Sequence, residues 1–156
     1  MIRRYQDGDL DEVLTVWHRA FRIAHPFLDD AFLTRERHAI ATVHLPMAET
    51  WVYRRDGRVL GFIAMVGQEI GGLFVDPTVQ GRGIGRALVD HARERWSPLD
   101  VEVFSSNRIG RRFYDRYGFT EVSQHVHEET GQVVLRLRIH RDAAPLTDGP
   151  RGEHDA

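Results

Sequence analysis

The sequence contains no lysine and no cysteine, and all 21 of its basic residues are arginine. Without lysine, the chain cannot form a Walker-type phosphate loop, a Schiff base to pyridoxal phosphate or a kinase-type lysine site. Without cysteine, it has no disulfides, zinc–thiolate sites, iron–sulfur clusters or thiol nucleophile. These absences exclude a disulfide scaffold, and they give no preference between a secreted and a cytosolic protein.

Long hydrophobic runs and an excess of one charge are also missing. The longest apolar stretch, near Leu60–Val66, is too short to span a bilayer, and the amino-terminal residues do not resemble a signal peptide. We therefore expect a cytoplasmic protein with no membrane partner. A formal charge of −2 argues against a nucleic-acid partner bound through its phosphates. The 156 residues, 42% hydrophobic and 28% charged, suit one folded domain.

Hydrophobic periodicity and turn signals predict an α+β fold, in which one layer of sheet is flanked by helices. We expect a mixed, mostly antiparallel sheet of about seven strands with about four helices, in the order β-α-α-β-β-β-α-β-α-β-β. The domain is predicted to cover residues 1–141, followed by a mobile polar tail over 142–156. The expected strands cover residues 2–5, 50–54, 58–66, 69–75, 99–104, 119–127 and 132–139, and the expected helices begin at residues 10, 29, 83 and 107.

A glycine-rich turn joins one of these strands to a helix. The strand that ends at Val75 leads through Asp76-Pro77 to three alternating glycines, Gly81, Gly83 and Gly85. Glycine accepts positive φ and lets a ligand approach the backbone closely. The free N–H groups at the start of the helix then form an anion site, and Arg82 and Arg86 add positive charge. The pattern predicts a pyrophosphate ligand. The Gly71-Gly72 pair earlier in the same strand indicates a bulge or a close backbone approach.

The spacing narrows the choice of pyrophosphate. A Rossmann G-x-G-x-x-G/A pattern fails, because its sixth position is Arg86 or Leu88, and a Walker pattern fails for want of lysine. The pattern Q-x-x-G-x-G fits, as Gln80, Gly83 and Gly85. Here the sequence resembles the GNAT superfamily of acyl-CoA-dependent N-acyltransferases. A second block, running from Val101 to Asn107 and from Arg112 to Phe119, resembles the superfamily's strand–Asn–helix–F-Y-x-x-x-G-F element.

The resemblance covers residues 2–140, and the segment His25-Pro26-Phe27 is similar to small single-domain bacterial members. It implies that Asn107 hydrogen-bonds the pantetheine of acetyl-CoA and that Tyr114 protonates the departing thiolate. Glu69 is the candidate base for the acceptor amine, and the alternative is a chain of water molecules, which many members of the superfamily use. The pyrophosphate would be held by the backbone of the loop, and the pantetheine and thioester by the preceding strand. The implied cofactor-binding residues, besides Asn107, are Leu73, Phe74, Val75, Gln80, Gly81, Arg82, Gly83, Ile84, Gly85 and Arg86.

Each of these residues also has a structural interpretation. Asn107 is a natural helix N-cap, Tyr114 could be a packed aromatic, and Glu69 could be solvated. The residues expected to contact the acceptor could equally belong to the core; they are Trp17, His25, Phe27, Trp51 and Tyr53. A metal pair at His125 and His127 lacks a third ligand at useful spacing, so no metal is expected.

The function implied is an acetyl-CoA-dependent N-acetyltransferase. Transfer to a primary amine would be direct, within a ternary complex, because no cysteine can carry the acetyl group. The alternatives are a non-catalytic acyl-CoA sensor, and a toxin acting on charged tRNA, which would need a basic face. Small amines, amino acids, antibiotics, peptide N-termini and protein lysines all remain possible acceptors. In this superfamily C-terminal hairpins often form dimer contacts, so the resemblance also implies a possible homodimer.

Overall fold

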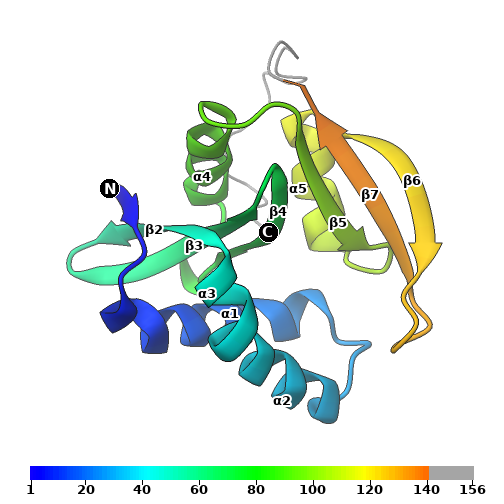
Figure 1. Ribbon diagram of the computed structural model, residues 1–156, viewed down its shortest axis with the longest axis horizontal. Coiled ribbons are helices and arrows are strands. Elements are labelled where there is room, and N and C mark those ends of the chain that lie inside the picture. The colour runs from blue at the N-terminus through cyan, green and yellow to red at the C-terminus, as the bar shows by residue number, and fades with distance from the viewer. Residues whose placement is uncertain (141–156) are drawn as a thin grey trace.

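A computed structural model describes residues 1–140 and contains one seven-stranded sheet (Figure 1). The strand order is β1-β2-β3-β4-β5-β7-β6, and only the β4–β5 pair is parallel. The α+β class and the mostly antiparallel sheet are therefore confirmed, whereas the predicted tail over 142–156 lies outside the described residues. The strands are β1 (Ile2–Arg4), β2 (Glu49–Arg55), β3 (Arg58–Val66), β4 (Glu69–Val75), β5 (Leu99–Phe104), β6 (Thr120–Val126) and β7 (Val133–Ile139).

Helices cover both faces of the sheet. Among residues 1–140, four helices have ten or more residues, as the sequence predicted, and none of the helices is long and apolar enough to cross a membrane. Figure 1 shows α1 and α2 together on one side of the molecule, with α4 and α5 on the other. The four are α1 (Leu10–Ala24), α2 (Asp30–Ala39), α4 (Ile84–Arg93) and α5 (Arg108–Tyr117).

The sheet separates two hydrophobic cores. On one face, α1 and α2 pack against β2 and β3, with Trp17 and Phe21 of α1 among the buried side chains. On the other face, α4 and α5 pack against the central strands, with Leu88, Phe113 and Tyr114 buried there. Each helix presents its apolar side chains at spacings of three and four residues, which is why the helical period was visible in the sequence.

The second helical segment differs from its predicted form. One helix over residues 29–44 was expected, ending before Pro46. Instead, α2 is followed by a wide π turn over Ile40–His44 and by the short helix α3 (Leu45–Met47). Pro46 lies in the first turn of this short helix, where its fixed φ suits a helical backbone.

A β-bulge divides β4, as its glycine pair predicted. The register with β3 pairs Ile70 with Met65 and Gly72 with Ala64, so Gly71 is an extra residue. An extra residue reverses the alternation of side chains along a strand. Consequently Ile70 and Leu73, three residues apart, both face the α4–α5 core, whereas Phe74 packs against the α1–α2 core.

Beyond the bulge, β4 and β5 separate. Their parallel pairing includes only Glu69 with Asp100 and Ile70 with Val101 (Figure 1). Further along β4, the Asp76 N–H bonds the Leu60 carbonyl of β3 at 2.8 Å. Because backbone groups alternate sides along a strand, Leu73 and Val75 then present their N–H and C=O groups towards β5. The divergence leaves this stretch of β4 backbone without a strand partner on its β5 side.

Candidate active site

The glycine-rich turn between β4 and α4 has the predicted left-handed conformation. Gly81 and Gly83 have φ values of 84° and 82°, and α4 starts immediately afterwards at Ile84. Within residues 1–140, and apart from the residues adjacent to Gly83 in the chain, no atom lies within 4 Å of the position that a Cβ would take there. The turn therefore leads directly into the N-terminus of a ten-residue helix, with open space where an anion would approach.

Side chains on both sides hold this turn in place. The buried Asp76 carboxylate accepts hydrogen bonds from the backbone and hydroxyl of Thr78 and pairs with Arg19 of α1 at 2.9 Å. Gln80 donates its side-chain amide to the Val75 carbonyl at 3.1 Å. This contact anchors the turn to β4, so the Gln80 side chain holds the loop rather than reaching out towards a ligand.

The two arginines of the turn differ in their surroundings. Arg82 is exposed, whereas Arg86 is half-buried with its guanidinium 5.4 Å from the centre of the Tyr117 ring. That contact fixes Arg86 against α5 and keeps a positive charge beside the first turn of α4. Both arginines thus add positive charge near the helix N-terminus, as the sequence predicted.

A cavity of about 180 Å³ occupies the space between the separating strands β4 and β5. We call it the β4–β5 cavity. It brings the predicted site residue Phe74 together with Asn107 and Tyr114, which lie far from it in the sequence. Leu73 also lines it, while the Val75 side chain is buried in the α4–α5 core.

Tyr114 projects from α5 into this cavity. Its side chain is only 4% exposed, and burial raises the pKa of its phenol above the ordinary value. The hydroxyl therefore keeps its proton at neutral pH and can donate it. Tyr114 also packs against Phe113 and Phe119, with ring centres 5.2 Å and 5.1 Å apart, so it is a core aromatic and a cavity residue at once.

Asn107 caps α5 and also contacts the end of α1. Its Oδ1 accepts a hydrogen bond from the Gly110 N–H at 2.9 Å, so the N-cap interpretation is confirmed. Its Nδ2 lies 3.3 Å from Nε2 of His25, and Nδ1 of His25 lies 3.0 Å from the Phe21 carbonyl oxygen. A chain of hydrogen bonds therefore joins the two helices through two buried side chains.

His25 should make the fold sensitive to acid. Burial lowers its pKa from 6.5 to about 4, so the folded protein favours the neutral ring. Between these values the unfolded chain takes up a proton that the folded chain does not. Lowering the pH from 7 to 4 should therefore remove about 3 kcal/mol of unfolding free energy through this group. Urea unfolding at both pH values measures the loss, and His25→Gln should lose that much less than the wild type. An equal loss in both would show that His25 is not responsible.

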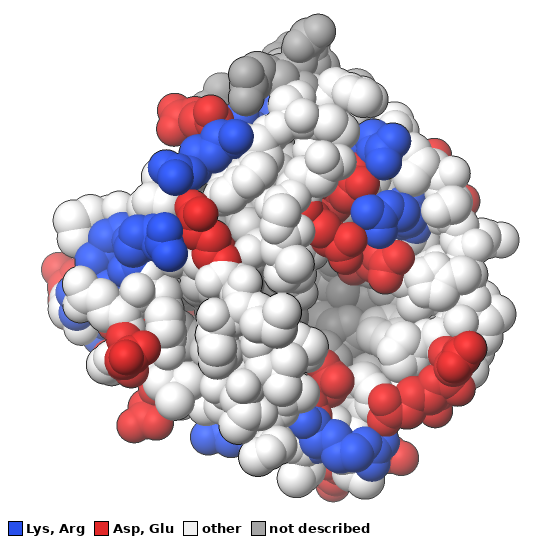
Figure 2. Space-filling view, in the orientation of Figure 1, with Lys and Arg blue, Asp and Glu red and all other residues white. Residues whose placement is uncertain are grey.

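A second cavity, of about 380 Å³, lies between α1, α2 and the β3–β4 hairpin. We call it the α2–β4 cavity. It shares Phe21, Gly71, Gly72 and Phe74 with the β4–β5 cavity, so the two meet at the bulge of β4. Figure 2 shows this face hollowed near its centre, with acidic side chains on opposite sides of the hollow. Its walls are otherwise mostly apolar, including Trp17, Ile40, Leu45 and Phe62.

Glu69 lines the α2–β4 cavity, two residues before the bulge. Its Oε1 pairs with Arg136 of β7 at 3.1 Å, and the carboxylate is 38% exposed. Arg136 also bonds Asp100 at 2.8 Å, and Arg138 bonds the same buried carboxyl, so both guanidinium groups hold the pKa of Asp100 below its usual range. Within residues 1–140 this network holds Glu69 through Oε1 alone.

Glu36 is a cavity residue that the sequence analysis missed. It lies on the inward stripe of α2 between Phe32 and Ile40, at spacings of four residues, and lines the α2–β4 cavity opposite β4. Burial raises the pKa of the Glu36 carboxyl. The charge of His44 lowers this pKa by a smaller amount, and the charge of Glu129 raises it further. Within residues 1–140 Glu36 forms no ion pair. A charged residue in an otherwise apolar helical stripe was the signal that could have identified it.

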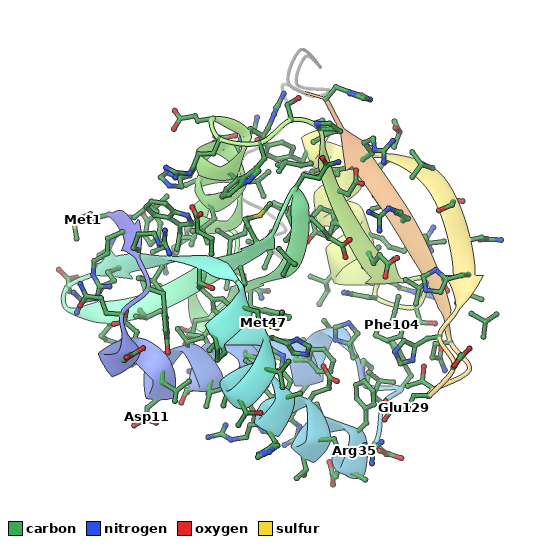
Figure 3. The ribbon with its side chains drawn as sticks, in the orientation of Figure 1. Met1, Asp11, Arg35, Met47, Phe104 and Glu129 are labelled. Carbon is green, nitrogen blue, oxygen red and sulfur yellow. The ribbon has the colours of Figure 1, made fainter. Side chains whose placement is uncertain are left out.

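A salt bridge connects α2 to the β6–β7 turn beside this cavity. Arg35 of α2 pairs with Glu129, and Figure 3 shows the two side chains directed towards each other. Phe104, labelled in the same view at the end of β5, stacks edge-on against His127 with ring centres 5.4 Å apart. The β6–β7 hairpin thus contacts both helical and strand walls of the site.

The five residues expected to contact an acceptor do not form one group. Trp17 lines the α2–β4 cavity, whereas His25 lines the β4–β5 cavity. Phe27 packs on Phe104 and lines neither cavity. Trp51 and Tyr53 also line neither, because β2 directs them to the α4 face of the sheet, where the Trp51 ring lies 4.3 Å from His91. The expectation that Phe27, Trp51 and Tyr53 line an acceptor pocket is therefore corrected.

The chain matches known acetyltransferases in sequence and in structure. A family model described as an acetyltransferase (GNAT) domain matches residues 46–121. Peptidyl-lysine N-acetyltransferase YiaC of Escherichia coli is 32% identical over 83% of this chain and 90% of that protein. Peptidyl-lysine N-acetyltransferase YjaB of the same organism is 33% identical over 88% of this chain and 94% of its own length.

Solved structures show the same fold. The solution structure of apo-form YjaB from Escherichia coli matches with a TM-score of 0.80 and 30% identity, covering 88% of this chain and 95% of that one. The crystal structure of PaiA N-acetyltransferase from Thermoplasma acidophilum, in complex with coenzyme A, matches with a TM-score of 0.72 over 87% of this chain and 96% of that one. At 15% identity, this second match concerns the fold alone.

Proposed function

The chain belongs to the GNAT superfamily and is an acetyl-CoA-dependent N-acetyltransferase, and from this premise we propose that it acetylates the ε-amine of lysine in a peptide or protein. The observation that carries the proposal is the meeting of two cavities at the bulge of β4. The β4–β5 cavity would hold the acetyl-bearing arm of the cofactor, and the α2–β4 cavity would hold the acceptor. Direct transfer needs both partners at one point, and the shared residues Gly71, Gly72 and Phe74 provide it.

We propose that the cofactor binds along β4 and the glycine-rich turn. The N-terminus of α4, with Arg82 and Arg86, would bind the pyrophosphate. The Leu73 backbone and the Val75 N–H, which have no strand partner on the β5 side, would hydrogen-bond the pantetheine. A backbone N–H directed at the thioester carbonyl would stabilise the oxyanion that develops during transfer, by about 2.7–4 kcal/mol in other acyl-transfer sites. Tyr114 would donate its proton to the departing thiolate within the cavity, where a thiolate would otherwise be poorly solvated.

The shape and lining of the α2–β4 cavity favour a lysine side chain. Its apolar walls suit four methylene groups, and its two carboxylates, Glu36 and Glu69, suit an ammonium group. We assign the base to Glu69, acting through a water molecule, because it is only two residues from the bulge. We assign binding of the incoming ammonium to Glu36 on the opposite wall. The names of YiaC and YjaB as peptidyl-lysine N-acetyltransferases support this acceptor class.

Two peptides test the acceptor. One carries a single lysine and a blocked N-terminus, and the other carries a free N-terminus and no lysine. We expect thiol release from acetyl-CoA, and acetyl-lysine by mass spectrometry, with the first peptide only. Because the enzyme has no lysine, any acetyl-lysine belongs to the acceptor. Transfer to the second peptide alone would show that N-terminal amines, and not lysine, are the acceptors. Binding of acetyl-CoA with no thiol release in the presence of any amine would favour an acyl-CoA sensor.

Substitution of the two carboxylates should separate binding from chemistry. Glu36→Gln should raise the KM for the lysine peptide by roughly 10- to 100-fold with little change in kcat, because a charge-assisted hydrogen bond is lost. Glu69→Gln should lower kcat by roughly 10²–10⁴-fold, because proton removal is lost. Steady-state kinetics at saturating acetyl-CoA measure both. If kcat falls in Glu36→Gln and not in Glu69→Gln, the two assignments are reversed.

We also propose that the chain forms a homodimer through the β6–β7 hairpin. Every residue of β6 is exposed, and within residues 1–140 this edge strand pairs with another strand on one side only. Val122 and Val126 add exposed apolar surface along it. Light scattering should give twice the chain mass, and Val126→Asp should return the protein to a monomer; a monomeric wild type would contradict this arrangement.

A further inference from the structure

The hydrogen-bond chain between α1 and α5 ends on a residue of the β4–β5 cavity. We propose that His25 is a positioning residue, which fixes the amide of Asn107 so that one Asn107 N–H donates to an amide carbonyl of the pantetheine arm. This inference rests on the proposed function, in which the β4–β5 cavity binds that arm. It replaces the contact with the acceptor that the sequence predicted for His25.

The tautomer of His25 follows from its partner on α1. The Phe21 carbonyl oxygen can only accept a hydrogen bond, so Nδ1 of His25, 3.0 Å away, must carry the proton. In a neutral ring, Nε2 then has only a lone pair. Burial lowers the pKa of His25 to about 4, so the ring is neutral throughout the physiological range. Nε2 is therefore a permanent acceptor directed at Asn107.

This acceptor determines how the Asn107 amide is turned. Nδ2 of Asn107, 3.3 Å from Nε2 of His25, is the only side-chain atom of Asn107 that can donate to it. The opposite atom, Oδ1, meets the Gly110 N–H at 2.9 Å. Turning the amide over would place two acceptors against each other at His25 and two donors against each other at Gly110. Both contacts exclude the reversed amide, so His25 and the helix cap select one orientation.

One hydrogen of Asn107 remains for a ligand. Nδ2 carries two hydrogens, and His25 accepts one of them. Asn107 and His25 both line the β4–β5 cavity, and Asn107 is 7% exposed. The pantetheine arm carries two amide groups, whose carbonyls are acceptors without a partner once they leave water. A donor held in one orientation binds such a carbonyl without the entropic cost of being ordered first.

The surroundings of His25 keep its ring from rotating. Its centre lies 4.0 Å from that of Phe21, 5.6 Å from Phe27 and 5.5 Å from Phe104. Pro26 follows it directly and ends α1, so the ring leaves the helix at a fixed point. In the three-residue segment His25-Pro26-Phe27, Pro26 ends α1, His25 provides the polar ring, and Phe27 packs against that ring.

Replacing His25 with glutamine or with asparagine distinguishes the role of Nε2 from the role of Nδ1. The His25→Gln side chain reaches the place of Nε2 and keeps an acceptor for Asn107, whereas His25→Asn reaches only the place of Nδ1. By calorimetry, we expect His25→Asn to weaken acetyl-CoA binding about 10-fold, as loss of one well-placed hydrogen bond does, and His25→Gln to remain within about threefold of the wild type. Binding of adenosine 3′,5′-bisphosphate, which lacks the pantetheine, should not change. Equal weakening of both ligands would show a general structural defect and overturn the proposal.

A double-mutant cycle tests whether His25 acts through Asn107. Asn107→Ser keeps an N-cap oxygen and loses both amide hydrogens, and it should weaken acetyl-CoA binding. In that background, His25→Asn should have no further effect. If His25→Asn weakens acetyl-CoA binding as much in the Asn107→Ser background as it does in the wild-type background, His25 does not act through Asn107. If Asn107→Ser leaves acetyl-CoA affinity unchanged, the proposed pantetheine contact itself is wrong, which is a distinct outcome. Thermal unfolding of each variant identifies any that is not folded at the temperature of the titration.

Discussion

Replacing Tyr114 with phenylalanine should lower kcat by roughly 10²–10⁴-fold while leaving the affinity for acetyl-CoA almost unchanged. The substitution removes one hydroxyl and keeps the ring, so the packing against Phe113 and Phe119 is retained. The thiolate leaving group then has no proton donor in a cavity where water is scarce. Stopped-flow or steady-state thiol release measures kcat, and calorimetry measures the affinity.

Tyr117 provides a matched control on the same helix. It is as buried as Tyr114, at 4% exposed, but its hydroxyl bonds the Asp90 carboxylate and it does not line the β4–β5 cavity. Tyr117→Phe should therefore reduce stability and leave kcat within a few-fold of the wild type. A Tyr114→Phe enzyme that turns over at the wild-type rate would remove Tyr114 from the acid role.

Gly83→Asp should greatly weaken the binding of acetyl-CoA. Gly83 is the N-cap of α4 and has a φ of 82°, a conformation that costs a residue with a Cβ. The new carboxylate would also project into the open space before the helix, where the pyrophosphate is proposed to bind, and would repel it. We expect affinity to fall on the order of 10²-fold or more, measured by calorimetry.

Two variants separate charge and strain at this position. Gly83→Asn has nearly the same size and tolerates left-handed φ, so it should retain more affinity than Gly83→Asp. Gly57→Asp introduces a carboxylate at another open position of positive φ, in the β2–β3 turn, and should leave binding unchanged. If Gly83→Asp binds acetyl-CoA normally, the turn does not hold the pyrophosphate.

Local patterns were sufficient to predict most of the fold. Asp-Gly between two β-rich segments is a strong hairpin signal, and Asp56-Gly57 indeed forms the β2–β3 turn with positive φ at both residues. The Gly71-Gly72 pair likewise predicted the bulge. The turn at Gly81 and Gly83 was predictable because glycine accepts positive φ. The wide turn at Ile40–His44 was not, since no residue type marks a π turn.

The sequence predicted the placement of site residues only where those residues lie within a single motif. Asn107 and Tyr114 lie in one sequence block, and the structure places both in one cavity. Trp51 was misplaced because an alternating strand pattern shows that a side chain faces one side, without showing which side. Glu36 was missed because its partners across the cavity come from β3 and β4, which are near it only in the folded chain.

A structure with a bisubstrate ligand would show at once what each of the two cavities binds. The ligand joins the sulfur of coenzyme A through an acetyl linker to the Nε of a lysine peptide. We predict the linker at Gly71 and Gly72, the sulfur beside Tyr114, and the lysine chain in the α2–β4 cavity between Trp17 and Phe62. Density for the coenzyme between β4 and β5 with the lysine chain outside the α2–β4 cavity would contradict the acceptor site. Density for the coenzyme elsewhere would contradict the account as a whole.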